Sequence, residues 1–179
     1  MPSSRFLRSI LGSGAVLALA VTGVTGTTGQ GTTTADASYS ADCTYTIGFW
    51  KTHPEYWSST RLQLGAVSYT AGEAGRILDT PVKGNGAVAL AHQLIGAKLN
   101  VALGADSSTA TDAIGQADTL LGGLVIPPIG SGSLKPAITA SPTFALTDFN
   151  EGVVGPGHCS GLPVQDPPGD GGGGVVTVS

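Results

Sequence analysis

The stretch Ala87 to Leu103, AVALAHQLIGAKLNVAL, is the longest segment of this sequence with a regular apolar pattern. Apolar residues recur every three to four positions and occupy two adjoining stripes of a helical wheel. So wide an apolar arc is typical of a helix that other elements cover on most sides. His92 and Lys98 interrupt the stretch and argue against a membrane span. We therefore predict that it is the central helix of a small domain.

A second helix is predicted just before the central one. Thr70-Ala71-Gly72-Glu73 has the spacing of a capping box, in which the Thr hydroxyl and the Glu carboxylate each satisfy a free backbone amide. Pro81 cannot continue a helix, so this one should end at about Asp79.

Two weaker helical patterns follow the central helix. One begins after the Thr109-Ala110-Thr111-Asp112 capping signal and is interrupted by Gly122-Gly123. The other runs from Phe144 to about Val153, with Leu146 and Phe149 facing inward. The proline-containing stretch 125–142 between them is expected to be a surface loop. The predicted fold is therefore mainly α, a small domain of three to four helices.

Most of the aromatic residues lie in one place, around TIGFWKTHPEYW at 46–57. Alternation over Tyr45 to Phe49 predicts a short extended segment, and Pro54 fits the first turn of a brief helix. Helices built from Ala and Gly have thin side chains. We therefore expect this aromatic segment to be largely irregular and to pack over them, contributing apolar area at about 25 cal/mol per Å² buried.

The alternative is that the same segment forms an exposed binding face. Trp50, Lys51, His53 and Trp57 are the candidate binding residues for a sugar or a peptide. With Glu55 added, Trp50, Trp57 and His53 could serve a carbohydrate-binding or hydrolytic protein. The sequence contains neither a serine-nucleophile elbow nor a phosphate-binding loop, and it predicts no catalytic residue and no cofactor.

The chain has only two cysteines, Cys43 and Cys159, at the two ends of the predicted helical part. In an exported chain an even pair most often forms a disulfide, which would close this domain. The alternative is a zinc site made by Cys43, His53, His158 and Cys159, since thiolate and imidazole suit that ion. The spacing lacks the closely paired ligands of a zinc finger.

The N-terminus has the features of a signal peptide over residues 1–37. Two arginines precede the short apolar run Ile10 to Val21, and Ala35-Asp36-Ala37 provides small residues for cleavage. We predict a secreted helical domain at 38–160 and a flexible Pro/Gly-rich tail at 161–179, where only Val175 to Ser179 could add a strand. The expected location is secreted or on the cell surface.

Charge excludes one class of partner. After signal removal six Lys and Arg face eleven Asp and Glu, a net charge of −5, and no basic run exceeds one residue. Nucleic-acid binding rests on clustered cations, so it is not expected, and neither is a membrane span in the processed chain. A cell-envelope protein or polysaccharide is the expected partner.

Three separated blocks resemble those of a secreted bacterial module with a GFWK(T/N)HP opening and a GPGHC ending. They are GFWKTHP from Gly48, the LA-QL--AKLN pattern from Leu90 to Asn100, and FN-G---GPGHC from Phe149 to Cys159. The resemblance covers about residues 43–159 and implies export, these domain limits and the disulfide. That family has no established activity. The expected function is an exported, non-catalytic structural or interaction module of the bacterial cell surface or extracellular matrix.

Overall fold

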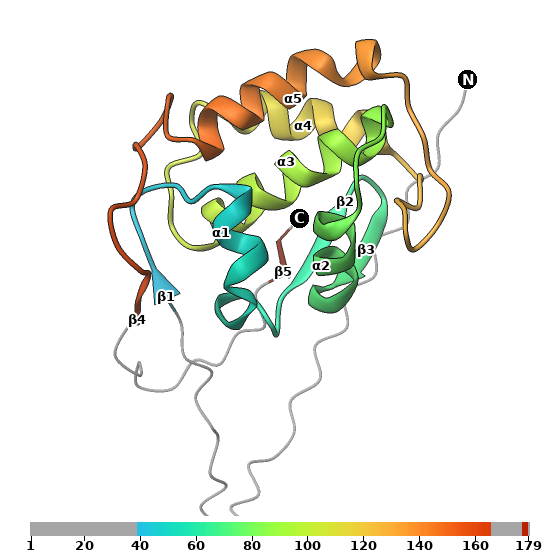
Figure 1. Cartoon of the computed structure of the whole chain (residues 1–179). Helices are drawn as coiled ribbons and strands as arrows, with labels where there is room; N and C mark the ends of the chain where they lie inside the picture. The colour runs from blue at the N-terminus through green and yellow to red at the C-terminus, as the bar shows by residue number, and fades with distance from the viewer. Residues whose placement is uncertain (1–38, 166–176, 179) are drawn as a thin grey trace, which may run out of the picture. The chain divides into compact units, whose positions relative to one another are not determined.

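The computed structural model describes residues 39–165 and 177–178 (Figure 1). The predicted signal peptide and residues 166–176 and 179 of the predicted tail lie outside the described residues. The helices are α1 (Ile47–Thr52), the 3₁₀ turn η1 (Pro54–Tyr56), α2 (Ala71–Asp79), α3 (Gly86–Ala102), α4 (Thr111–Leu121) and α5 (Pro136–Asn150). The strands are β1 (Tyr39–Ser40), β2 (Arg61–Leu64), β3 (Val67–Thr70), β4 (Val164–Gln165) and β5 (Thr177–Val178).

Helix α3 is central, as its apolar pattern predicts. It contacts α1, α2, α4, α5 and β2, and α5 packs along it most extensively (Figure 1). The side chain of Asn85 caps its first turn by accepting from the amide of Ala87 at 2.9 Å. Because α3 is covered on most sides, even its polar residues Lys98 and Asn100 are buried.

The capping box before α2 is confirmed. The amide of Glu73 donates to the Thr70 hydroxyl at 3.3 Å, and the amide of Thr70 donates to the Glu73 carboxylate at 2.8 Å. The helix ends at Asp79, as expected. The second capping signal is not used: α4 begins after Ala110, and no side chain caps it.

The predicted loop at 125–142 is wrong in its second half. Helix α5 begins at Pro136, where a first-turn proline loses no helical hydrogen bond, and continues through Pro142 to Asn150. Pro142 is tolerated because α5 buries a stripe of residues at helical spacing against α3. The burial of this stripe offsets the one helical hydrogen bond that Pro142 cannot donate. The stripe contains Thr139, Pro142, Leu146 and Phe149. The described residues therefore hold five α-helices instead of three or four.

The prediction of a mainly α fold also omitted a β-hairpin, and helices account for only about half of the described residues. Strands β2 and β3 pair antiparallel through a turn at Gly65-Ala66, with Leu62 opposite Tyr69. Both of these side chains are buried. Strand β5 pairs parallel with the other edge of β2, and β1 pairs with β4, so strands occur within the predicted tail.

The aromatic segment is helical where an extended segment was expected. Helix α1 begins at Ile47 because the Thr46 hydroxyl accepts from the amide of Phe49 at 3.2 Å. The brief turn at Pro54 is confirmed as η1. Trp50 and Trp57 are 1% and 3% exposed, so they contribute apolar area to the core, as the structural interpretation expects.

Candidate functional site

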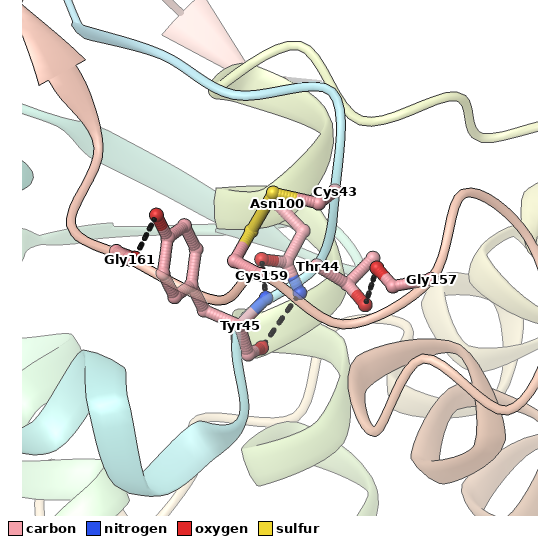
Figure 2. The surroundings of a disulfide bond; sticks show 7 residues. All are labelled: Cys43, Thr44, Tyr45, Asn100, Gly157, Cys159 and Gly161. Carbon is pink, nitrogen blue, oxygen red and sulfur yellow. Dashed lines mark hydrogen bonds between the residues drawn. A yellow bond between two sulfur atoms is a disulfide. The ribbon is translucent and has the colours of Figure 1, made fainter.

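Cys43 and Cys159 form a disulfide that joins the segment before α1 to the segment after α5 (Figure 2). Around it the two chain segments run parallel: the amide of Thr44 donates to the carbonyl of Gly157 at 2.8 Å, and the amide of Cys159 donates to the carbonyl of Thr44 at 3.0 Å. Because both sulfurs are bonded to each other, neither is a thiolate. The alternative zinc site of Cys43, His53, His158 and Cys159 is therefore wrong. Within residues 39–165 and 177–178 no group of three or more His, Cys, Asp or Glu is placed to hold a metal ion.

Asn100 of α3 is the polar centre of the same region (Figure 2). Its carboxamide accepts from the amide of Tyr45 at 2.8 Å and donates to the carbonyl of Tyr45 at 2.9 Å and to the side chain of Asn150 at 3.0 Å. Asn150 in turn donates to the main chain and the side chain of Gln93, both at 2.9 Å. Both asparagines are fully buried. The second and third sequence blocks thus meet in one hydrogen-bonded network, which also holds the main chain of Tyr45, three residues before the first block.

The four candidate binding residues do not share one face. Trp50 lies in the core, and the indole nitrogen of Trp57 donates to its carbonyl at 3.0 Å. The ring of His53 stacks on Phe49 with centroids 4.3 Å apart, and its Nδ1 lies 3.1 Å from the carbonyl of Phe49. The hydroxyl of Thr52 lies 3.0 Å from the same Nδ1, so this nitrogen is held by α1 itself. Glu55 is exposed on η1.

Lys51 and Trp57 instead line a pocket between the α1–η1 segment and α2. Its volume is about 380 Å³, and α2 contributes Gly72, Gly75 and Asp79 to its wall. The two glycines leave this wall without side chains. A Cβ on Gly75 would lie 3.9 Å from the ring of Trp57, and one on Gly72 would have no heavy atom within 4 Å. The pocket therefore has an apolar, partly backbone surface.

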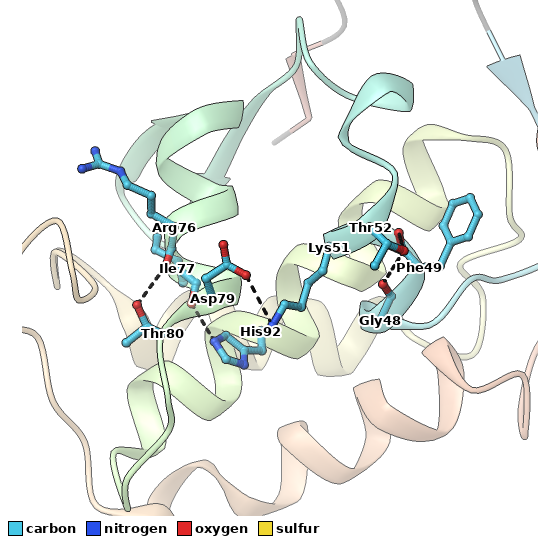
Figure 3. Close-up of polar contacts among 9 residues, drawn as sticks. All are labelled: Gly48, Phe49, Lys51, Thr52, Arg76, Ile77, Asp79, Thr80 and His92. Atoms are coloured by element: carbon cyan, nitrogen blue, oxygen red, sulfur yellow. Dashed lines mark hydrogen bonds and ion pairs between the residues drawn. The ribbon is translucent and has the colours of Figure 1, made fainter.

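Three charged residues line this pocket: Lys51, Arg76 and Asp79, which are drawn in Figure 3. The ammonium of Lys51 lies 3.4 Å from a carboxylate oxygen of Asp79, which joins α1 to α2 at the surface. Arg76, one turn before Asp79, is exposed and also lines the pocket. With two cations and one carboxylate around an apolar surface, the arrangement is suited to binding a group that has an apolar body and a polar or anionic end.

His92 lies next to this ion pair (Figure 3) and is buried. Its Nε2 lies 2.7 Å from the carbonyl of Ile77. Burial lowers the pKa of His92 below its usual value, and nearby Lys51 lowers it further. The bond to Ile77 and the charge of Asp79 act in the opposite direction. A neutral His92 that donates to a carbonyl serves packing between α2 and α3.

Sequence reasoning missed the α2 side of the pocket. Gly72, Gly75, Arg76 and Asp79 recur at spacings of three and four residues, which places them on one helical face. This pattern is visible in the sequence, yet only the tertiary structure sets that face opposite Lys51 and Trp57.

None of the helices within residues 39–165 is long and apolar enough to cross a membrane. Comparison of the whole chain with models of protein families, with curated proteins and with solved structures found no match.

Proposed function

We propose that this protein is an exported, non-catalytic interaction module of the bacterial cell surface or extracellular matrix. The observation that carries this proposal is that residues of the resembling region hold the fold together. Asn100 and Asn150, in the second and third blocks, are buried and hydrogen-bonded, and Cys43 and Cys159 are joined. These residues maintain a scaffold, which is the role expected of a structural or binding module.

Export is supported by the disulfide together with the signal-like N-terminus. Disulfides form and persist in oxidising compartments, and this one joins residues 116 positions apart. Mass spectrometry of protein secreted by its own bacterium should find an N-terminus within a few residues of Ser38. Recovery only from the cytoplasm with Met1 intact would contradict export.

The pocket between α1–η1 and α2 is the proposed contact surface. A partner side chain can enter with its apolar body against Pro54 and Ala71, while its polar end reaches Lys51 or Arg76. A volume of about 380 Å³ is at the small end of the range for ligand pockets and suits one or two side chains. Stacking of sugars on the indoles is not part of this proposal, because both rings are buried.

Site-specific photo-crosslinking on intact producing cells tests the proposal. A photoreactive residue at Ser58, which lines the pocket, should give a discrete cross-linked envelope product. The matched control is the same residue at Ser141, exposed on α5. Gly75→Leu, which fills the pocket, should abolish the product at Ser58 while the circular dichroism spectrum is retained. Equal labelling from both positions, or labelling that survives Gly75→Leu, would overturn the pocket as the contact. Release of cleaved sugars or peptides from cell-wall material would overturn the non-catalytic role.

A further inference from the structure

Strand β2 is central in its sheet only because β5 covers one of its edges. The strand order is β3-β2-β5: β3 follows β2 through the hairpin turn, whereas β5 comes from the far end of the chain (Figure 1). The pairing is parallel and short, with Arg61 opposite Thr177 and Leu62 opposite Val178. The outer edge of β2 is thus a backbone surface that accepts an extended segment.

The accepting part of this edge is limited to its first half. Farther along β2, the carbonyl of Gln63 accepts a hydrogen bond from the ammonium of Lys98 at 2.7 Å. That carbonyl is already satisfied, so the part of the edge that takes a strand lies at Arg61 and Leu62, where β5 pairs. The residues around β5 read Val175-Val176-Thr177-Val178, and β-branched residues favour strands.

The donor segment is joined to the domain by a long connection. Eleven residues, 166–176, separate β4 from β5, and five of them are glycine. Fully extended, a chain of this length reaches about 35–40 Å, which is enough to serve the edge of a neighbouring molecule as well as its own.

We propose that the outer edge of β2 is a strand-acceptor site and that its partner is the Thr177–Val178 strand of a second copy of this chain. The main-chain hydrogen bonds and the register are the same whichever copy donates the strand. At low concentration a molecule's own strand covers the edge, because a flexible connection of eleven residues gives that strand an effective concentration of about a millimolar. When copies are crowded, the same strands link neighbouring molecules. This surface is separate from the pocket and does not rest on the proposed function.

The test uses the full processed chain with Thr177→Pro and Val178→Pro, which remove the two amides of the molecule's own strand. A fluorescent peptide, Gly-Gly-Val-Val-Thr-Val-Ser, should bind this variant at least tenfold more tightly in an anisotropy titration than it binds the unaltered chain. The control is Gly172→Pro, a proline in the connection, which should behave like the unaltered chain. Absence of saturable binding at millimolar peptide, in a variant with an unaltered circular dichroism spectrum and disulfide, would overturn the acceptor site.

A second arm tests whether the partner is another copy. The Pro-Pro variant carrying Arg61→Cys is mixed at high concentration with a chain carrying Thr177→Cys, and an intermolecular disulfide is expected on a non-reducing gel. Ser141→Cys in place of Thr177→Cys is the matched control and should not form the link. Peptide binding without a link between copies would overturn the assignment of a second copy as the partner.

Discussion

The ammonium of Lys98 on α3 lies 2.8 Å from a carboxylate oxygen of Asp118 on α4, and the two side chains are 2% and 26% exposed. The other carboxylate oxygen accepts from the amide of Gly65 at 2.8 Å, and Lys98 also donates to the carbonyl of Gln63. One charge pair therefore holds two helices and the β2–β3 hairpin together. Because the ammonium of Lys98 is buried, its bonds to Asp118 and to the carbonyl of Gln63 both matter for stability.

Asp118→Ala should lower the free energy of unfolding by about 3 kcal/mol, because it leaves the Lys98 ammonium buried without its counter-charge. Lys98→Met should cost less, since the carboxylate of Asp118 is partly solvated and keeps its bond to Gly65. Urea denaturation measures both changes. Glu151→Ala, an exposed control, should stay within about 0.5 kcal/mol of the unaltered protein. An Asp118→Ala loss as small as the control would contradict the role of the pair.

Replacing both cysteines, Cys43→Ser with Cys159→Ser, should lower the free energy of unfolding by up to about 4–5 kcal/mol in the chain-entropy model. The loss arises because a long loop is no longer closed in the unfolded chain. Limited proteolysis should then cut first near residues 40–60, before α3. The reduced unaltered protein is the matched control and should show the same pattern. Initial cleavage within α3 would show that the disulfide does not secure the N-terminal segment.

Asn100→Ala should destabilise the protein by about 2–4 kcal/mol, because the buried amide and carbonyl of Tyr45 lose their partner. Gln93→Ala is the control within the same network. Gln93 is only half-buried and its side chain bonds Asn150 alone, so the loss should be about 1 kcal/mol or less. Chemical denaturation of the two variants side by side measures the difference. Equal losses would mean that Asn100 is not the centre of the network.

Replacing Gly75 or Gly96, two helix-interior glycines, with alanine should change the stability in opposite directions. Gly75→Ala should stabilise the protein by about 0.5–1 kcal/mol, because the new Cβ meets only the Trp57 ring at 3.9 Å. Gly96→Ala should destabilise it by about 1–3 kcal/mol, because its Cβ would lie 3.0 Å from Asn150 and from Ile47. Thermal unfolding monitored by circular dichroism compares the two. A Gly96→Ala variant as stable as Gly75→Ala would contradict the close packing of α3.

Stability should fall as the pH drops through the range in which unfolded histidine becomes charged. Burial lowers the pKa of His92 in the folded protein, so below the usual histidine pKa of about 6.5 the unfolded chain binds more protons. The loss should level off below the folded-state pKa. His92→Gln should flatten the dependence between pH 7.5 and 5.5, measured by urea denaturation in buffers of equal ionic strength. An unchanged slope in that variant would show that His92 does not cause it.

The contribution of Glu73 to stability should depend on pH in a lower range than that of His92. Hydrogen bonds from Thr70 lower the pKa of this carboxyl below its ordinary 4.5, so the contribution of the capping box is present above that value and is lost as the pH falls through the folded-state pKa. The stability that depends on Glu73 is lost at lower pH than the stability that depends on His92. His92→Gln should therefore leave the Glu73-dependent loss unchanged.

The sequence predicts best where the physical cause is local. The helix over Gly86–Ala102 follows from apolar periodicity, and α2 follows from its capping box and from the proline beyond it. The extended segment predicted at Tyr45 to Phe49 is wrong because the Thr46 cap and burial of Trp50 favour a helical turn there. The alternation at Leu62, Leu64, Val67 and Tyr69 is also a local signal, and it marks the hairpin that the helical interpretation missed.

By itself, therefore, the sequence determined the central helix, the capped helix before it and the existence of one pair of cysteines. Only the tertiary structure decided that α5 continues through Pro142 and that Lys98 pairs with Asp118. It also decided that the glycine face of α2 lines a pocket together with Lys51 and Trp57. Periodicity and capping act within a few residues, so they can be read along the chain. Burial and charge pairing act between residues that are far apart in sequence, and their free energies depend on contacts that exist only after the chain has folded.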